Sequence, residues 1–114
     1  MDKIFEKTLL FDFYGELLTD RQKELYQLYH LDDLSLGEIS EQLSISRQGV
    51  FDAVKRCDKQ LSHFEDKLQL VHRFVRNKDR AAQIYALTKQ IQSEHSIAAV
   101  DQIKAITKEI ISDM

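Results

Sequence analysis

The side chains best suited to contact a nucleic acid follow Ser46. A helix that begins at the next residue would present one outward face to a partner. On that face lie Arg47, Gln48, Phe51, Lys55 and Arg56. Arginine, lysine and glutamine hydrogen-bond to base edges and phosphates, and a phenylalanine ring can stack on a base or fill a protein pocket. Asp52 shares the face and is unfavourable beside phosphate. The pattern predicts either sequence-specific DNA binding or a scaffold and protein-binding surface.

A second cationic segment spans residues 67–80, with the sequence KLQLVHRFVRNKDR. It contains five lysines and arginines and one acid. Its candidate contact residues are Arg73, Arg76, Lys78 and Arg80. Such a segment can follow the phosphates of RNA or of a ribonucleoprotein. It is also typical of a solvated helix end, where cations face the helix dipole favourably.

No set of residues has the spacing of a catalytic or metal site. The four histidines show no i, i+4 pairing with one another or with Cys57, so no metal site is predicted. Cys57 lies on an apolar helical stripe, which favours a buried thiol over a reactive one. Asp32 and Asp33 are typical of a turn, and there is no glycine-rich phosphate loop or nucleophile elbow. We therefore expect a protein that is not an enzyme and uses no cofactor.

Length and composition restrict the class of protein. The chain has 114 residues, of which 43% are hydrophobic and 31% charged, with no proline and three glycines. These values favour one helical domain with short turns over a disordered chain or a sheet protein. No apolar run approaches the roughly 18 residues of a membrane span, and the N-terminus lacks a basic region followed by an apolar stretch, so we expect neither a membrane span nor a secretory signal. A single cysteine suits a reducing cytoplasm.

Charge is unevenly distributed along the chain, whose net charge is −3 at pH 7. Residues 1–54 have five lysines and arginines against eleven acids. Residues 55–80 have eight against four, which gives a local net charge of +4. The local value bears more directly on a phosphate-binding face than the whole-chain value does.

Apolar periodicity and capping residues predict about six helices and no strand. An N-terminal helix over residues 3–18 has a wide apolar stripe, within which we find no specific role for Gly15. Thr19 and Ser35 each begin a capping box, and Ser46 caps a further start. The predicted helices that follow these caps cover residues 20–30 and 36–43 and a third segment from residue 47.

The apolar positions after Val50 recur at alternating steps of four and three as far as Val75. This heptad pattern predicts one long helix over about 47–76. Its apolar stripe is longer than a domain of this size covers, so either later helices fold back on it or a second chain covers it. We favour a homodimer, the commonest oligomer. The interface would contain Phe64, Leu68, Val71 and Val75. We expect a turn at residues 77–79. Two further helices would follow it, over residues 79–93 and 97–111.

Residues 34–56 have the layout of a helix-turn-helix. Two short helices that cross steeply need apolar contacts between them. These are supplied by Ile39, Leu43, Ile45, Val50 and Ala53. Ser40 is the small residue where the helices touch. Ser44 stands in the turn where glycine is usual, which implies some backbone strain.

A resemblance to region four of sigma factors extends over residues 18–61, LTDRQKELYQLYHLDDLSLGEISEQLSISRQGVFDAVKRCDKQL. With the opening FEKTLLFDFYGELLTDRQ included, nearly the whole chain resembles the small bacterial YlxM family. The resemblance implies an all-α protein with a helix-turn-helix core, a long central helix and C-terminal helices. We expect a single helical domain over 1–114, with its core at 18–61 and a dimerising extension at 62–114.

The resemblance also implies a function. The YlxM family is associated with the signal recognition particle, because its gene neighbours those of the particle's GTPase. It is also labelled as DNA-binding or regulatory. We therefore expect a cytoplasmic accessory protein that binds the particle's RNA or its GTPase. The alternative is a dimeric DNA-binding transcriptional regulator, and an adaptor that binds only protein is a third interpretation.

Overall fold

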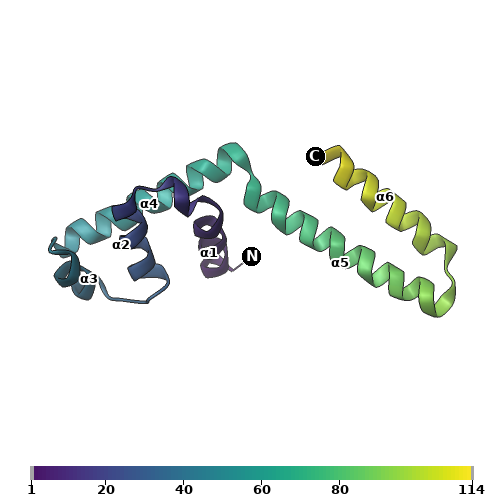
Figure 1. Cartoon of the computed structure of the whole chain (residues 1–114), viewed down its shortest axis with the longest axis horizontal. Coiled ribbons are helices and arrows are strands. Elements are labelled where there is room, and N and C mark those ends of the chain that lie inside the picture. Colours follow the sequence, from purple (N-terminus) through teal and green to yellow (C-terminus); the bar gives the residue numbers. More distant parts are fainter. Residues whose placement is uncertain (1, 114) are drawn as a thin grey trace. The chain divides into compact units, whose positions relative to one another are not determined.

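A computed structural model of the chain describes residues 2–113, which form helices and no strand (Figure 1). The elements are α1 (Lys3–Tyr14), the 3-10 helix η1 (Gly15–Leu17), α2 (Asp20–His30), α3 (Leu36–Leu43), α4 (Arg47–Leu68), α5 (Leu70–Glu94) and α6 (Ile97–Asp113). The predicted all-α class is confirmed. Within residues 2–113, no helix is long and apolar enough to cross a membrane.

The chain divides into two compact units, residues 1–71 and residues 72–114. The N-terminal unit contains α1 to α4 and the first residues of α5. The C-terminal unit contains the rest of α5 and α6. The boundary between the units lies beyond residue 61, where we expected the core to give way to the extension.

Side-chain caps set the starts of three helices in the N-terminal unit. Thr19 and Ser35 each form a complete capping box, with Gln22 and Glu38 returning a hydrogen bond to the cap backbone. The Ser46 hydroxyl accepts a hydrogen bond from the Gly49 amide at 2.9 Å. These caps satisfy amides that the first turn of a helix leaves unpaired, so the predicted starts at 20, 36 and 47 are confirmed.

The helix-turn-helix core is a cluster of buried side chains from three helices. Leu25, Ile39, Val50 and Val54 form its centre. Ser44 adopts the left-handed conformation, with φ at 57°, so it occupies the turn position where glycine is usual. The Ser40 hydroxyl donates to the Ile45 carbonyl and holds the turn closed.

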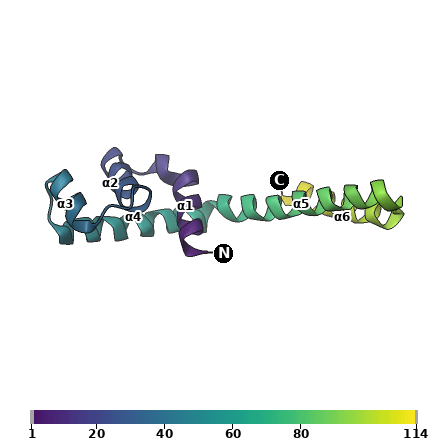
Figure 2. The ribbon, with the colours of Figure 1, turned by 90° about the horizontal axis from the view of Figure 1, so that it is seen from below.

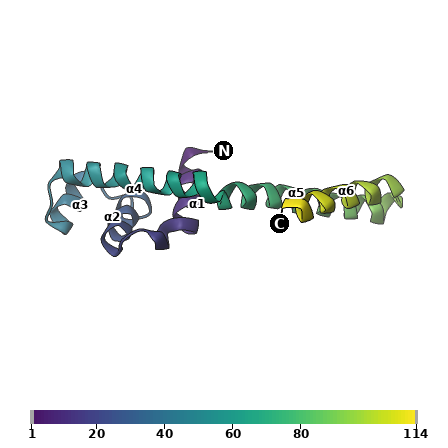
Figure 3. The same cartoon turned by 90° about the horizontal axis from the view of Figure 1, so that it is seen from above.

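The helix α1 extends this core along α4, and Figures 2 and 3 show α1, α2 and α3 packed along α4. The rings of Phe11 and Tyr26 stack with centroids 5.4 Å apart. The Tyr26 hydroxyl donates to Asp58 on α4 at 2.7 Å, and Tyr14 donates to Glu65 at 2.5 Å. Each buried tyrosine therefore combines apolar packing with a satisfied hydroxyl.

The first predicted helix is too long, because α1 ends at Tyr14 and a 3-10 turn replaces its last residues. Gly15, for which the sequence offered no explanation, is buried at this change of direction. A β-carbon at Gly15 would lie 3.1–3.3 Å from three atoms of the Phe11 ring. The close approach of that ring explains the glycine.

The predicted continuous helix over 47–76 is wrong, because the chain breaks at Gln69. Gln69 has φ at 55°, α4 ends at Leu68 and a new helix begins at Leu70. The new helix gains substitute hydrogen-bond partners: the Leu70 amide donates to the Tyr14 hydroxyl at 3.0 Å, and the Val71 amide donates to the Glu65 carboxylate at 3.0 Å. The predicted turn at 77–79 is also wrong, since α5 runs through it.

In the C-terminal unit, α5 and α6 form an antiparallel hairpin (Figure 1). The connection passes through His95, which has φ at 51°, and the Ser96 hydroxyl caps α6 by accepting from the Ala99 amide at 3.2 Å. Among residues 72–113, only Arg80 and Ala99 are buried. The apolar residues between the helices stay half-buried; they are Ile84, Leu87, Ile91, Ile103, Ile106 and Ile110.

Candidate nucleic-acid interface

The predicted contact face at the start of α4 is exposed, but two of its side chains already have neighbours. The Arg47 guanidinium lies over Gly37 on α3, where a β-carbon would be 3.1–3.3 Å from three of its atoms. The Gln48 amide donates to the Asp52 carboxylate at 3.0 Å. Gln48 therefore already pairs with the acid that was expected to oppose phosphate binding.

Phe51 and Lys55 lie one turn apart on α4 and contact each other. Phe51 is 43% exposed, which is a large exposure for a phenylalanine side chain. The Lys55 ammonium lies 5.0 Å from the centroid of the ring. The pair places a flat apolar ring and a cation at the same point of the surface.

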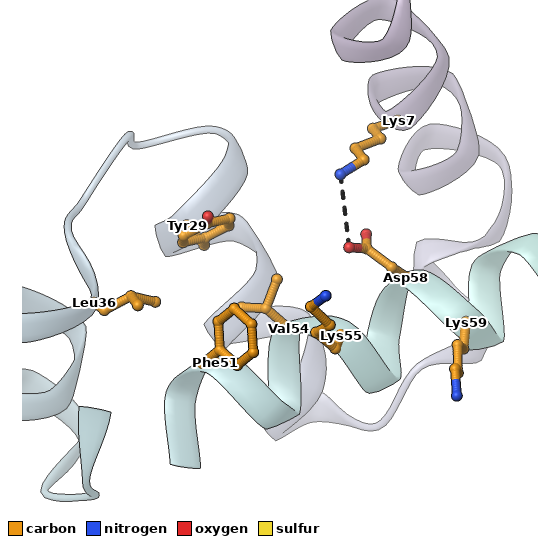
Figure 4. A pocket seen from close by; sticks show the side chains of 8 residues that line it. All are labelled: Lys7, Tyr29, Leu36, Phe51, Val54, Lys55, Asp58 and Lys59. Carbon is orange, nitrogen blue, oxygen red and sulfur yellow. Dashed lines mark ion pairs between the residues drawn. The ribbon is translucent and has the colours of Figure 1, made fainter. Parts of the chain in front are cut away.

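Phe51 and Lys55 line a cavity of about 370 Å³ in the N-terminal unit (Figure 4). It is bounded by α1, α2, α3 and α4. The lining residues are Lys7, Tyr29, Leu36, Phe51, Val54, Lys55, Asp58 and Lys59. Figure 4 shows Tyr29, Leu36 and Phe51 toward one end of the cavity, and Lys7 and Asp58 toward the other. The cavity thus has an aromatic half, where the Lys55 ammonium lies over Phe51, and a charged half with Lys7 and Asp58.

Asp58 is the acid of the charged half, and its oxygens are engaged. One oxygen accepts from the Tyr26 hydroxyl, and the other lies 3.6 Å from the Lys7 ammonium. His30 Nε2 lies 3.8 Å from the first oxygen. Burial lowers the pKa of His30, an effect that Asp58 opposes and Lys7 adds to. With three lysines against this one aspartate, the cavity lining has a net charge of +2.

The cationic surface continues along α4 beyond the cavity. A second hollow of about 290 Å³ is lined by Arg56, Lys59, Gln60, His63 and Phe64. Arg56 is exposed, as is Lys59, which lines both hollows. We call Lys7, Lys55, Arg56 and Lys59 the α4 cation cluster.

Two arginines of the cationic segment at 67–80 already have acidic partners within the protein. Arg80 is only 4% exposed, so its expected contact with a nucleic acid is corrected. Its guanidinium donates to Asp113 at 2.5 Å and lies 3.5 Å from Glu109, and Arg76 lies 3.5 Å from Asp113. The hydrogen bond from Arg80, with the charge of Arg76, holds the pKa of Asp113 below its usual value. Arg73 and Lys78 are exposed.

The comparisons with known proteins identify a family. The family model UPF0122, described as "Putative helix-turn-helix protein, YlxM / p13 like", matches residues 1–110. A UPF0122 protein of Acetivibrio thermocellus is 48% identical over 111 residues, which cover 96% of this chain and 95% of the relative. The UPF0122 protein YlxM of Bacillus subtilis is 40% identical over 108 residues, covering 95% and 96%.

This chain belongs to the UPF0122 family of YlxM-like proteins. The resemblance to the YlxM family is therefore confirmed over nearly the whole chain. The family description names a helix-turn-helix, in agreement with the fold of α3 and α4. The same fold region includes most of the α4 cation cluster.

The four residues expected at a dimer interface differ from one another in burial and in their contacts. Val71 is 4% exposed and lies beside the Glu65 cap, and the Phe64 ring is 6.0 Å from Tyr14. Leu68 is 47% exposed, and Val75 is half-buried. The break at Gln69 separates the four positions between two helices, so they do not form one continuous stripe.

Sequence reasoning missed Lys7, Tyr29 and Lys59 as candidate site residues. Lys7 reaches the cavity because α1 packs on α4, and no local pattern encodes that contact. Lys59 was detectable: it follows Lys55 by one turn, on the same side of α4. The predicted contact face has Arg56 near its edge and therefore leaves Lys59 out.

The described residues do not provide the donor set of a metal site. Within residues 2–113, no three histidine, cysteine, aspartate or glutamate side chains are grouped so that they could hold a metal ion. Cys57 is fully buried, and burial raises the pKa of its thiol to about 11. A thiol with that pKa stays protonated near neutral pH and is a poor nucleophile.

Proposed function

We propose that this chain is a non-enzymatic protein that binds RNA through the α4 cation cluster. The observation that carries the proposal is the succession of Lys55, Arg56 and Lys59 along α4 beside the exposed Phe51 ring, which the Lys55 ammonium contacts, with Lys7 lining the same cavity as Phe51. Cations bind phosphates through counterion release, and an exposed aromatic ring stacks on bases. With Phe51 and three of the four cations, α4 offers both kinds of contact.

The placement of the cations favours RNA over base reading in duplex DNA. A helix-turn-helix reads bases with the first residues of its second helix. Here Arg47 packs over Gly37, and Gln48 is hydrogen-bonded to Asp52. Lys55, Arg56 and Lys59 lie about two to three turns further along α4, where they would follow a phosphate backbone.

Within this proposal, we assign the protein to the signal recognition particle pathway. The resemblance to the YlxM family supports it, since that family is associated with the particle. The partner would be the particle's RNA, with its GTPase as a second partner in the same complex. A cytoplasmic location follows from this assignment and agrees with a buried, unbridged cysteine.

We further propose that the protein is a homodimer, paired through α5 and α6. A two-helix layer cannot cover its own apolar face. The six leucine and isoleucine residues between its helices accordingly remain half-buried. A second hairpin would cover them in a four-helix arrangement. Arg73 and Lys78 would then supply further cations from both copies.

A transcriptional regulator is the second candidate function, and one observation favours it. The α4 start is exposed, and Ser46, Arg47 and Gln48 lie at the end that enters the major groove in helix-turn-helix complexes. In this case Arg47 and Gln48 would release their present neighbours and contact base edges.

Charge reversal on α4 tests the main proposal. Lys55→Glu combined with Lys59→Glu should weaken binding to the particle's RNA by at least about tenfold at 0.1 M salt, since two phosphate contacts are lost. The matched control is Lys104→Glu combined with Lys108→Glu, which makes the same change of charge at the same spacing on exposed α6 positions. Fluorescence anisotropy measures both affinities.

Two outcomes of this experiment contradict the proposal. Equal losses in the two double variants would show that net charge alone governs binding. A large loss on one duplex DNA sequence upon Arg47→Ala and Gln48→Ala, with RNA binding unchanged by Lys55→Glu and Lys59→Glu, would establish the transcriptional regulator instead.

A further inference from the structure

The cavity between the four helices of the N-terminal unit has the two-part chemistry of a nucleotide. Its volume of about 370 Å³ falls in the range of roughly 300–1,000 Å³ found for small-molecule sites. Phe51 and Tyr29 contribute aromatic surface, and Val54 and Leu36 contribute apolar surface. Lys7, Asp58 and Lys59 lie toward the other half, and the Lys55 ammonium lies beside the aromatic surface, 5.0 Å from the Phe51 ring centroid.

We propose that this cavity binds a single nucleotide, with the base against Phe51 and Tyr29 and the phosphate at Lys7, while Lys55 and Lys59 add positive charge to the cavity lining. The nucleotide has two sources, an unpaired residue of an RNA or a free nucleotide. The RNA source deepens the proposed function and rests on it. Recognition of unpaired bases by aromatic side chains beside cations is common in RNA-binding proteins.

The one acid of the cavity is compatible with an anionic ligand. Asp58 already accepts from Tyr26 at 2.7 Å and lies 3.6 Å from Lys7. A phosphate that approached Lys7 would share its ammonium with Asp58, while Lys55 and Lys59 have no carboxylate partner within 4 Å among the described residues. The Lys55 ammonium lies over one face of Phe51, so the base would stack on the other face or displace it.

Free nucleotides test the cavity without RNA. AMP, GMP, CMP and UMP are titrated into the isotope-labelled full chain, with inorganic phosphate as a separate probe. We expect saturable NMR shifts at Tyr29, Phe51 and Val54 with nucleotides. Phosphate alone should move only the lysines and their neighbours. An absence of saturable shifts at the aromatic residues would overturn binding of free nucleotides.

A pair of RNA hairpins tests the other source. One hairpin has a single bulged nucleotide, and the other is fully paired. The wild-type protein should bind the bulged hairpin about tenfold more tightly, because stacking of one base is worth that much. Phe51→Ala should abolish the preference. Phe51→Leu keeps the apolar bulk and should abolish it too, because leucine has no flat ring.

The chain offers a matched control for Phe51. Tyr85 on α5 is 63% exposed, and Lys89 one turn later lies 4.9 Å from its ring centroid. This pair reproduces the Phe51 and Lys55 arrangement on a helix surface away from the cavity lining. Tyr85→Ala should leave both the preference for the bulge and the nucleotide shifts unchanged.

The outcomes separate the cavity proposal from the proposed function. Equal affinity for the two hairpins with no nucleotide shifts would overturn the cavity proposal and leave RNA binding by α4 intact. Saturable nucleotide shifts without any RNA binding would support the cavity as a free-nucleotide site and contradict the proposed function. Shifts at Phe51 caused by an acidic peptide, and by no nucleotide, would assign the cavity to a protein partner and overturn the proposal.

Discussion

Asp58 is the residue at which three side chains of the N-terminal unit converge. Tyr26 donates to it, Lys7 forms an ion pair with it, and His30 lies within 3.8 Å. Burial is the largest influence on His30 and lowers its pKa, while the nearby carboxylate raises it and Lys7 lowers it. The folded protein therefore favours neutral His30 more than the unfolded chain does.

His30 makes the stability of the protein depend on pH. Between the lowered pKa of the folded state and the ordinary value near 6.5, the unfolded chain binds more protons, so stability rises with pH. Above about pH 6.5, His30 is neutral in both states and does not affect stability. As the pH falls below that value, the unfolded chain takes up a proton first, and the free energy of unfolding decreases. Urea unfolding of the wild type at pH 7.5 and at pH 5.5 should show lower stability at the acidic pH.

His30→Gln should flatten this pH dependence, because glutamine does not titrate. His63→Gln is the control, because it makes the same substitution at an exposed position. An equal difference between the two pH values in wild type and His30→Gln would show that other groups cause it.

Single residues were predictable where local physics specifies them. Thr19, Ser35 and Ser46 were assigned as caps because a capping oxygen must stand at a fixed distance before an apolar run. Phe51 and Lys55 were found because helical phase alone places them outward. Arg80 was misplaced, since its burial depends on Asp113, which lies 33 positions later in the chain. Lys7 was missed for the same reason.

The junction between α4 and α5 is the element that periodicity failed to reveal. The apolar steps continue across residue 69, and neither proline nor glycine stands there. Tyr14 and Glu65 provide hydrogen-bond partners for the Leu70 and Val71 amides. The break therefore leaves fewer backbone amides unpaired than a helix start usually does. A heptad count contains no information about such partners from another helix.

Gln69→Gly tests the break directly. Gln69 holds a left-handed conformation that costs a side-chain-bearing residue roughly 1 kcal/mol, and glycine avoids that cost. The substitution should therefore raise the free energy of unfolding by up to about 1 kcal/mol. Gln69→Ala, which keeps a β-carbon, should bring no such gain. Thermal denaturation followed by circular dichroism measures both variants.

A continuous helix predicts the opposite order. Glycine in a helix interior is less stable than alanine by roughly 1 kcal/mol. Gln69→Ala more stable than Gln69→Gly would therefore contradict the break and restore one helix from 47 to 76. The helix starts at residues 20, 36 and 47 do not depend on this result.

At the scale of the whole molecule, the two units differ in how completely they bury apolar surface. The N-terminal unit contains a core with fully buried Tyr14, Tyr26, Ile39 and Leu61. The C-terminal hairpin buries Ala99 and leaves its larger apolar residues half-exposed. Only the first unit has the core of an independent domain, which supports a second copy as the cover of the hairpin.

Sedimentation of the wild-type protein at tens of micromolar should show a dimer. Leu87→Lys places a charge on the half-buried face of α5 and should shift the protein to monomer. Circular dichroism of the variant establishes whether the helices persist. A wild-type protein that sediments as a monomer, or a Leu87→Lys variant that stays dimeric, would contradict pairing through α5 and α6.

The salt dependence of RNA binding tests the central claim most directly. Affinity falls with salt in proportion to the number of phosphates that the protein neutralises. We predict that Lys55→Ala combined with Lys59→Ala reduces the slope of log affinity against log salt by about 1.4 to 1.8, which is two contacts. Lys104→Ala combined with Lys108→Ala should leave the slope unchanged. An unchanged slope in the first double variant would show that α4 does not contact the phosphates.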